Sequence, residues 1–275
     1  MTRWLLGWCL LASCGPAPTP AAEQPAPVVK AAAAPSPAAD PPSATLIPHD
    51  RLPDPRVAAT MELPEATAGP VIMRTASLAE GESLELPASP DHEHLILVLD
   101  GELMLAPGDA PGALVRAWHV ARARDVPVVL EATRPSQLVS AIVHGEALRK
   151  RDVEVINLSD HALLTWADGR AHALLGFEDG RASFGLLLSH AEVGVPRHAH
   201  EGSVEVIGLL SGDGTMGIGD EERSVTSGEV FHMPKGVEHD YSPAGTKTLF
   251  AVQLYVPPGP EQRFKDLAKK GATPP

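Results

Sequence analysis

Three histidines and one glutamate near the C-terminus have the residue types and spacing of metal ligands. His198 and His200 are two residues apart, Glu205 follows closely, and His239 comes after a Pro-Lys-Gly segment. Alternate residues of a strand point to the same face, so the first two histidines can approach one ion at about 2.1 Å from each ring nitrogen. Three imidazoles and a carboxylate suit a divalent metal in a catalytic type of site. We therefore look for function in this segment.

Turn signals explain how the other two ligands could reach the same ion. The Glu-Gly-Ser segment 201–203 is expected to turn the chain so that Glu205 faces inward from the next strand. The apolar run 204–210 predicts that buried strand, which should end at the turn cluster 211–214. Pro234 and Gly236 favour a tight turn that returns His239 to the same interior.

These residues resemble the two sequence motifs of the cupin family. The first motif, G-x5-H-x-H-x(3,4)-E-x6-G, is similar to His198, His200, Glu205 and Gly212, and the second, G-x5-P-x-G-x2-H-x3-N, to Gly228, Pro234, Gly236 and His239. Two positions depart from the pattern, because the leading glycine is only four residues before the histidine, at Gly194, and Pro243 replaces the final Asn. Neither position supplies a metal ligand in the family, so the departures concern loop shape.

The distribution of turns predicts an all-β chain. Gly-, Asp- and Pro-containing turn signals separate short runs rich in Val, Leu and Ile. One short C-terminal helix is expected over residues 261–270, with Pro260 in its first turn and Gly271 as its cap. The resemblance implies double-stranded β-helix barrels of the jelly-roll type.

Two stretches of the chain look alike, which resembles a bicupin. Residues 94–101 and 205–212 each place an apolar strand before a glycine. The tandem units are expected at residues 58–153 and 154–275. Aligning Gly101 with Gly212 puts His94 at the position of Glu205, and Pro87 and Ser89 at the positions of the first two histidines. The first unit is therefore expected to be a degenerate cupin. A structural role is expected for the His92-Glu93-His94 segment in preference to a second metal site.

The N-terminal segment resembles a bacterial lipoprotein signal. Residues 1–14 contain Arg3, a short apolar stretch and the lipobox-like Leu-Ala-Ser-Cys sequence ending at Cys14. Such a stretch is shorter than the roughly 20 apolar residues that span a bilayer as a helix. The resemblance implies a lipid on Cys14 and, because Gly15 follows, an outer-membrane protein facing the periplasm. A fortuitously apolar N-terminus is the alternative. Residues 15–57 are rich in Pro and Ala and predict a disordered tether.

The net charge and the N-terminal segment limit the kinds of molecule that the protein is expected to bind. A formal net charge of −13 argues against binding nucleic acid, since no basic stripe could neutralise phosphates. A small-molecule ligand or substrate and a membrane anchor are expected, and pairing of the units within one chain or between the chains of a homodimer stays open. The metal could be Mn, Fe, Ni, Cu or Zn. Affinity order favours Cu and Zn, whereas mixed N and O ligands also suit the others.

Two functions remain open at this point. The resemblance suggests a metal-dependent enzyme such as a dioxygenase, a decarboxylase or a sugar-acid isomerase, with Glu205 as both ligand and proton acceptor. Tyr241 could donate a hydrogen bond to the substrate or simply pack at the rim, and packing is expected for His232. The alternative is a non-catalytic module that binds metal or a small ligand. Ile207 and Leu209, with Phe184, Phe231 and Phe250 as further lining, favour a cavity for a partly apolar molecule, as an enzyme would need, although the same residues could also build a core.

Overall fold

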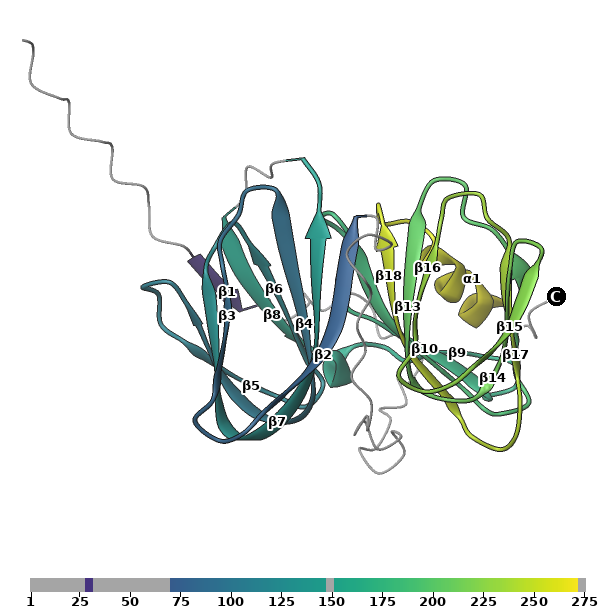
Figure 1. The fold of residues 1–275 in the computed structure, drawn as a ribbon, viewed down its shortest axis with the longest axis horizontal. Helices are drawn as coiled ribbons and strands as arrows, with labels where there is room; N and C mark the ends of the chain where they lie inside the picture. The colour runs from purple at the N-terminus through teal and green to yellow at the C-terminus, as the bar shows by residue number, and fades with distance from the viewer. Residues whose placement is uncertain (1–27, 32–69, 147–150, 272–275) are drawn as a thin grey trace, which may run out of the picture.

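The computed structural model describes residues 28–31, 70–146 and 151–271, which are mostly antiparallel strands. They form two β-barrels side by side, the first in blue and teal and the second in green and yellow (Figure 1). Within these ranges, no helix has the length and apolar character needed to cross a membrane. The all-β fold class with one C-terminal helix is confirmed.

The first barrel is a single sheet in the order β1-β8-β6-β4-β7-β2, with β3 paired to β7 and β5 to β4. Its interior is filled by apolar side chains, among them Leu86, Ile96, Val98, Leu103 and Leu105. Its strands are β1 (Val28–Ala31), β2 (Val71–Leu78), β3 (Ser83–Leu86), β4 (His92–Pro107), β5 (Ala113–Arg116), β6 (His119–Arg124), β7 (Val128–His144) and β8 (Asp152–Asn157).

Two expected boundaries change in this barrel. The predicted division after residue 153 falls inside β8, which pairs along its whole length with β6. The first unit therefore ends after Asn157, where a 3-10 turn (Leu158–Asp160) begins the connection. Four residues of the expected tether form β1, which pairs in parallel with β8. The rest of the tether and the signal segment lie outside the described residues.

The second barrel consists of two facing sheets. Six strands lie in the order β16-β13-β18-β11-β10-β9, and four in the order β12-β17-β14-β15. The strands are β9 (Leu164–Trp166), β10 (Ala171–Leu175), β11 (Ser183–Ser189), β12 (Val195–His198), β13 (Val204–Ser211), β14 (Gly214–Ile218), β15 (Glu221–Val225), β16 (Val230–Met233), β17 (His239–Pro243) and β18 (Leu249–Val256).

The two barrels share a hydrophobic core. One face of β13 and β18, with Val206, Phe250 and Leu254, packs against β2, β4 and β7 of the first barrel, where Met73 and Leu97 are fully buried. Because strand side chains alternate, the other face of β13 and β18 points into the second barrel. The interface thus determines which side chains can line a site inside that barrel.

Helix α1 (Gln262–Lys270) covers part of the second barrel. It ends at Gly271, whose left-handed φ of 58° suits glycine and confirms the expected C-terminal cap. The buried ring of Phe264 stacks on Trp166 of β9 at 5.5 Å between ring centroids. This contact holds the helix over the barrel interior (Figure 1).

Candidate metal centre

The fold brings the four predicted ligands together between the two sheets of the second barrel. His198 ends β12 and His239 begins β17, and the two residues are paired in register. Glu205 comes from β13 in the opposite sheet, and His200 lies in the loop that joins β12 to β13. One potential ligand atom from each of the four lies within 4.8 Å of the others. An ion with bonds of about 2.1 Å requires only a small contraction of this group.

The expected turns produce this convergence. Residues 199–203 connect β12 to β13, as predicted, and Ser203 anchors the loop by donating its hydroxyl hydrogen to the carbonyl of Pro257 at 2.8 Å. The turn before β17 closes through the N–H of Val237, which donates to the carbonyl of Pro234 at 3.2 Å. Gly236 has a φ of 73° and donates its N–H to the carbonyl of His200 at 3.0 Å, which ties the two ligand-bearing loops together.

Backbone carbonyls orient two of the histidines. The Nδ1–H of His198 donates to the carbonyl of Pro196 at 2.7 Å, and the Nδ1–H of His239 donates to the carbonyl of Val237 at 3.0 Å. Each bond leaves Nε2 as the atom that faces the cluster. Metal-bound histidines characteristically donate their second ring N–H to a carbonyl or carboxylate, so the arrangement fits ligation through Nε2.

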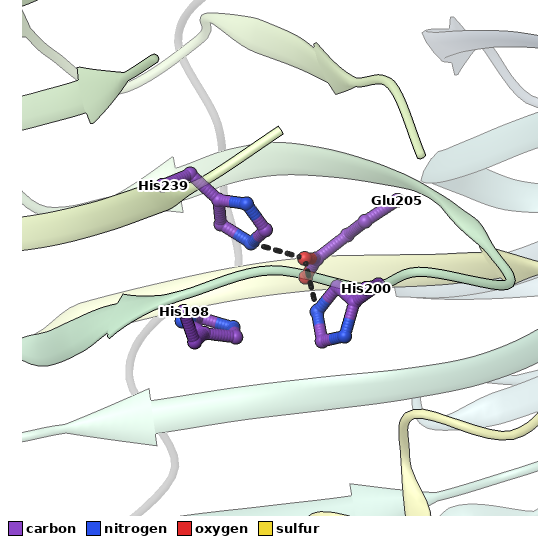
Figure 2. Close-up of side chains that lie close together, drawn as sticks. All are labelled: His198, His200, Glu205 and His239. Carbon is purple, nitrogen blue, oxygen red and sulfur yellow. Dashed lines mark hydrogen bonds and ion pairs between the residues drawn. The ribbon is translucent and has the colours of Figure 1, made fainter. Parts of the chain in front are cut away.

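Glu205 lies at the centre of the cluster and is only 1% exposed. The rings of His200 and His239 approach its Oε2 atom from two sides, with Nε2 atoms at 3.1 and 2.9 Å (Figure 2). Burial alone would raise the pKa of Glu205, but hydrogen bonds from these two histidines outweigh it and lower the pKa to about 2. Glu205 is therefore a carboxylate at neutral pH and a suitable anionic ligand for a cation.

The histidines differ in their affinity for protons. Burial, with the positive charges of His239 and Arg263, lowers the pKa of His198 to about 4, so its Nε2 lone pair is available at neutral pH. Burial would also lower the pKa of His239, but the hydrogen bond and charge of Glu205 raise it above its usual value. The donor set therefore fits a divalent metal, which would take the place of the His239 proton facing Glu205.

The cluster lies on the wall of a small cavity of about 50 Å³. Most of its lining is apolar, including Trp166, Leu187, Ile207, Leu209, Met216 and Leu249. Phe264 and Leu267 of α1 also contribute to this wall. A ligand of a few non-hydrogen atoms could lie next to the metal ligands and be shielded from water.

The observed lining of the cavity differs from the predicted lining at the three phenylalanines. Ile207 and Leu209 line the cavity as predicted, but Phe184, Phe231 and Phe250 do not. Phe184 and Phe250 pack in the core between the barrels, on the opposite face of their strands. Phe231 packs within the second barrel beneath the guanidinium of Arg223. The aromatic lining comes instead from Trp166, Tyr241, Tyr255 and Phe264.

Tyr241 lines the cavity, on the same face of β17 as His239, but its hydroxyl is already used. It donates its hydrogen to the carbonyl of Asp213 at 2.9 Å. This contact favours the packing interpretation of Tyr241 over donation to a substrate. His232 is neither a member of the ligand cluster nor part of the cavity wall, which agrees with the expected packing role.

Tyr255 is a site residue that the sequence motifs did not identify. It is paired with Glu205 in the β13–β18 register, is 3% exposed and forms a side-chain hydrogen bond with the Glu205 carboxylate. Burial, followed by the charge of Glu205, raises the pKa of Tyr255 well above its ordinary value. The hydroxyl therefore stays protonated and can hold the carboxylate in place.

The His92-Glu93-His94 segment has structural contacts. The ring of His92 packs edge-on against His144 at 4.4 Å, and Nε2 of His94 donates to the carbonyl of Pro87 at 3.0 Å. Buried Glu93 accepts a hydrogen bond from the backbone N–H of Arg181 at 3.4 Å. Across the described ranges, the C-terminal cluster is the one group of three or more His, Cys, Asp or Glu side chains that could hold a metal.

Comparisons with known proteins agree with this geometry. The cupin domain family model matches residues 187–255, which contain all four ligands. No curated protein matches the chain. Oxalate decarboxylase from Bacillus subtilis superimposes with a TM-score of 0.59 at 10% identity, over 68% of each chain. The putative glyoxylate-induced protein from Pseudomonas aeruginosa superimposes with a TM-score of 0.54 at 15% identity, over 67% of this chain and 73% of that one. Residues 187–255 of the second barrel thus match the cupin domain family, and the fold of the described chain is similar to those of these solved structures, with a bicupin-like architecture.

Proposed function

We propose that the second barrel binds a divalent metal through four residues, His198, His200, Glu205 and His239. With this metal it acts as an enzyme on a small molecule, either a dioxygenase or a related enzyme. The observation that carries the proposal is that these four donors converge on the wall of a mostly apolar cavity and are not enclosed by protein on every side. Catalytic metal sites keep such an open position, whereas purely structural sites are closed. A bound ion would supply Lewis-acid polarisation of a coordinated oxygen atom.

The identity of the metal stays open among Mn, Fe, Ni, Cu and Zn. One solved structure of Bacillus subtilis oxalate decarboxylase, at 10% identity, carries a title that refers to its Mn(II) centres. This likeness supports a divalent ion in the present chain. Mixed imidazole and carboxylate donors suit manganese as well as iron, nickel, copper and zinc.

The pKa of about 2 at Glu205 changes the role expected for this residue. A proton acceptor works best when its pKa lies near the working pH, so a carboxylate of such low basicity is a weak general base. Glu205 therefore acts as a ligand that Tyr255 and two histidines hold in place. This low basicity is also the observation that favours the second candidate, a non-catalytic module that binds metal and a small ligand.

A reaction screen distinguishes the two candidate functions, the enzyme and the non-catalytic binding module. Protein loaded with each of the five metals is offered catechols, flavonols, β-dicarbonyls and small dicarboxylates, and oxygen uptake and product formation are measured. The enzyme proposal predicts turnover with at least one metal. It also predicts that Glu205→Gln lowers both metal affinity and turnover, whereas the exposed control Glu201→Gln leaves both near wild type. If no metal supports turnover while the protein retains a small ligand, the binding module replaces the enzyme.

We also propose that the protein is an outer-membrane lipoprotein facing the periplasm and anchored by lipid on Cys14. The proposal is supported by the lipobox-like sequence that ends at Cys14 and by the Pro/Ala-rich composition of the segment that follows it. It is tested separately from the metal centre.

A further inference from the structure

Gln253 is a buried polar residue that lines the cavity and is not one of the proposed metal ligands. It lies on β18 two residues from Tyr255, on the face that lines the cavity, and is 5% exposed. Its Oε1 atom is buried and has no hydrogen-bond partner among the described residues. A buried amide oxygen without a donor is unfavourable, so this position suits a ligand that brings an O–H group.

Arg263 is a second polar residue on the same wall. It lies in the first turn of α1 and is close enough to the cluster for its charge to act on His198 and His239. No side-chain hydrogen bond or ion pair joins Arg263 to another described residue. By contrast, the cavity residue Asp240 is engaged by Arg197 at 3.1 Å. A guanidinium that lines a cavity in this way can bind a carboxylate through two parallel hydrogen bonds.

The charges of the site favour an anion. A divalent ion, the Glu205 carboxylate and the Arg263 guanidinium together leave the cavity positive, so a ligand ammonium group would be repelled. Gln253 and Tyr255 are two residues apart on β18 and therefore about 7 Å apart along the cavity wall, which leaves room for a small molecule between the Glu205 contact and Gln253. The small volume of the cavity excludes large ligands.

We propose that Arg263 and Gln253 form the ligand-recognition part of the site and select a small hydroxycarboxylate. The carboxylate pairs with Arg263 beside the metal ligands, and the hydroxyl donates its hydrogen to Oε1 of Gln253. This inference rests on the proposed metal centre, because it names the class of molecule that the cavity beside that centre holds.

Glycolate and acetate test the assignment, since they differ only by the hydroxyl group. Their binding to manganese-loaded protein is measured by isothermal titration calorimetry, and the titrations are repeated without metal. Wild type should bind glycolate about 3-fold to 10-fold more tightly than acetate, the range of one neutral hydrogen bond. Gln253→Leu should reduce glycolate affinity to that of acetate and leave acetate binding unchanged.

The arginine is tested with the same two ligands. Arg263→Ala should weaken both by about 10-fold or more, as expected for a lost charge-assisted bond, and Arg263→Lys should restore part of the affinity. Lys269→Ala is the matched control, because Lys269 lies on the same helix, is 76% exposed and does not line the cavity. Thermal melting and metal content establish that each variant is folded and loaded.

The outcomes for the two proposals are distinct. A wild type that takes up no metal contradicts the proposed function, and the metal-free titrations then still measure the contributions of Arg263 and Gln253. A wild type that binds metal but holds glycolate no better than acetate, or an Arg263→Ala variant with wild-type affinity for both, overturns the recognition proposal alone.

Discussion

His239 shows most clearly how single residues prepare the site for a metal. Both of its ring nitrogens face oxygen acceptors, the carbonyl of Val237 at 3.0 Å and the carboxylate of Glu205 at 2.9 Å. Without a metal, only the doubly protonated ring can donate to both. The raised pKa of His239 agrees with this state. A metal ion would remove the Nε2 proton and retain the Nδ1 contact.

Metal binding should therefore release protons. Because the folded-state pKa of His239 is raised, its proton is held to higher pH than in an ordinary histidine and leaves when the ion binds. His198, with a pKa of about 4, is already neutral at pH 7 and releases none. We predict release of up to about one proton per metal near pH 7, and metal affinity that increases with pH. Calorimetry in two buffers of different ionisation enthalpy measures the number of protons released per metal ion. Metal binding without proton release would contradict this account.

The motif spacing predicted the four residues that converge in the second barrel, but not the residues around them. The ligands were identifiable because two histidines on one strand face, followed by a third histidine after a Pro-Lys-Gly turn, form a combination that chance rarely produces. Tyr255 and Gln253 stand out only as the polar members of the run Leu249–Val256, and their two-residue separation was the available signal. The hydrogen bond from the Tyr241 hydroxyl to the Asp213 carbonyl joins strand β17 to the turn before β14, a contact between distant segments that local sequence does not specify.

At the scale of elements, the Pro-Lys-Gly turn before β17 positions His239. Gly236 has a φ of 73°, and a Cβ there would meet the nearest atom at an ordinary 3.5 Å, so any penalty comes from the backbone conformation. We predict that Gly236→Ala lowers the free energy of unfolding by about 1 kcal/mol and weakens metal binding. Urea unfolding and metal titration measure the two effects. Gly202→Ala, in the loop between β12 and β13, is the control, since its φ is not left-handed and no atom lies within 4 Å. Equal effects in both variants would refute the role of the turn.

Strands were predictable, but the direction of their faces was not. The apolar run 204–210 forms β13 (Val204–Ser211) as expected, and both of its faces are buried. Sequence alternation alone cannot tell which of two apolar faces lines a barrel and which packs against a neighbour. The sequence pattern therefore predicts Phe184 and Phe250 in the cavity wall, whereas both pack in the core between the barrels.

At the scale of the whole molecule, the two barrels divide their roles. The first is filled with apolar side chains, and the second keeps a cavity beside the ligand cluster. The core that both barrels share buries one face of β13 and β18, and the opposite face of these strands carries Glu205, Gln253 and Tyr255. The first barrel thus supports the strands that form the site.

The proposed anchor also concerns the whole molecule. Cys14→Ser should prevent lipid attachment and move processed protein from the detergent-requiring fraction to the buffer-soluble fraction. Fractionation and mass spectrometry of the N-terminus measure this. Cys9→Ser is the control, because Cys9 lies before the expected cleavage position. Membrane retention of the Cys14→Ser protein with a processed N-terminus would refute the lipoprotein proposal.

The most direct test of the central claim is the metal content of purified protein, measured by elemental analysis after loading and desalting. We predict about one divalent ion per chain in wild type, loss of most of that ion in His200→Ala, and wild-type content in His92→Ala, since the proposal places a single site in the second barrel. Equal loss of metal in the two variants, or a wild type that retains none, would contradict the assignment of the metal centre.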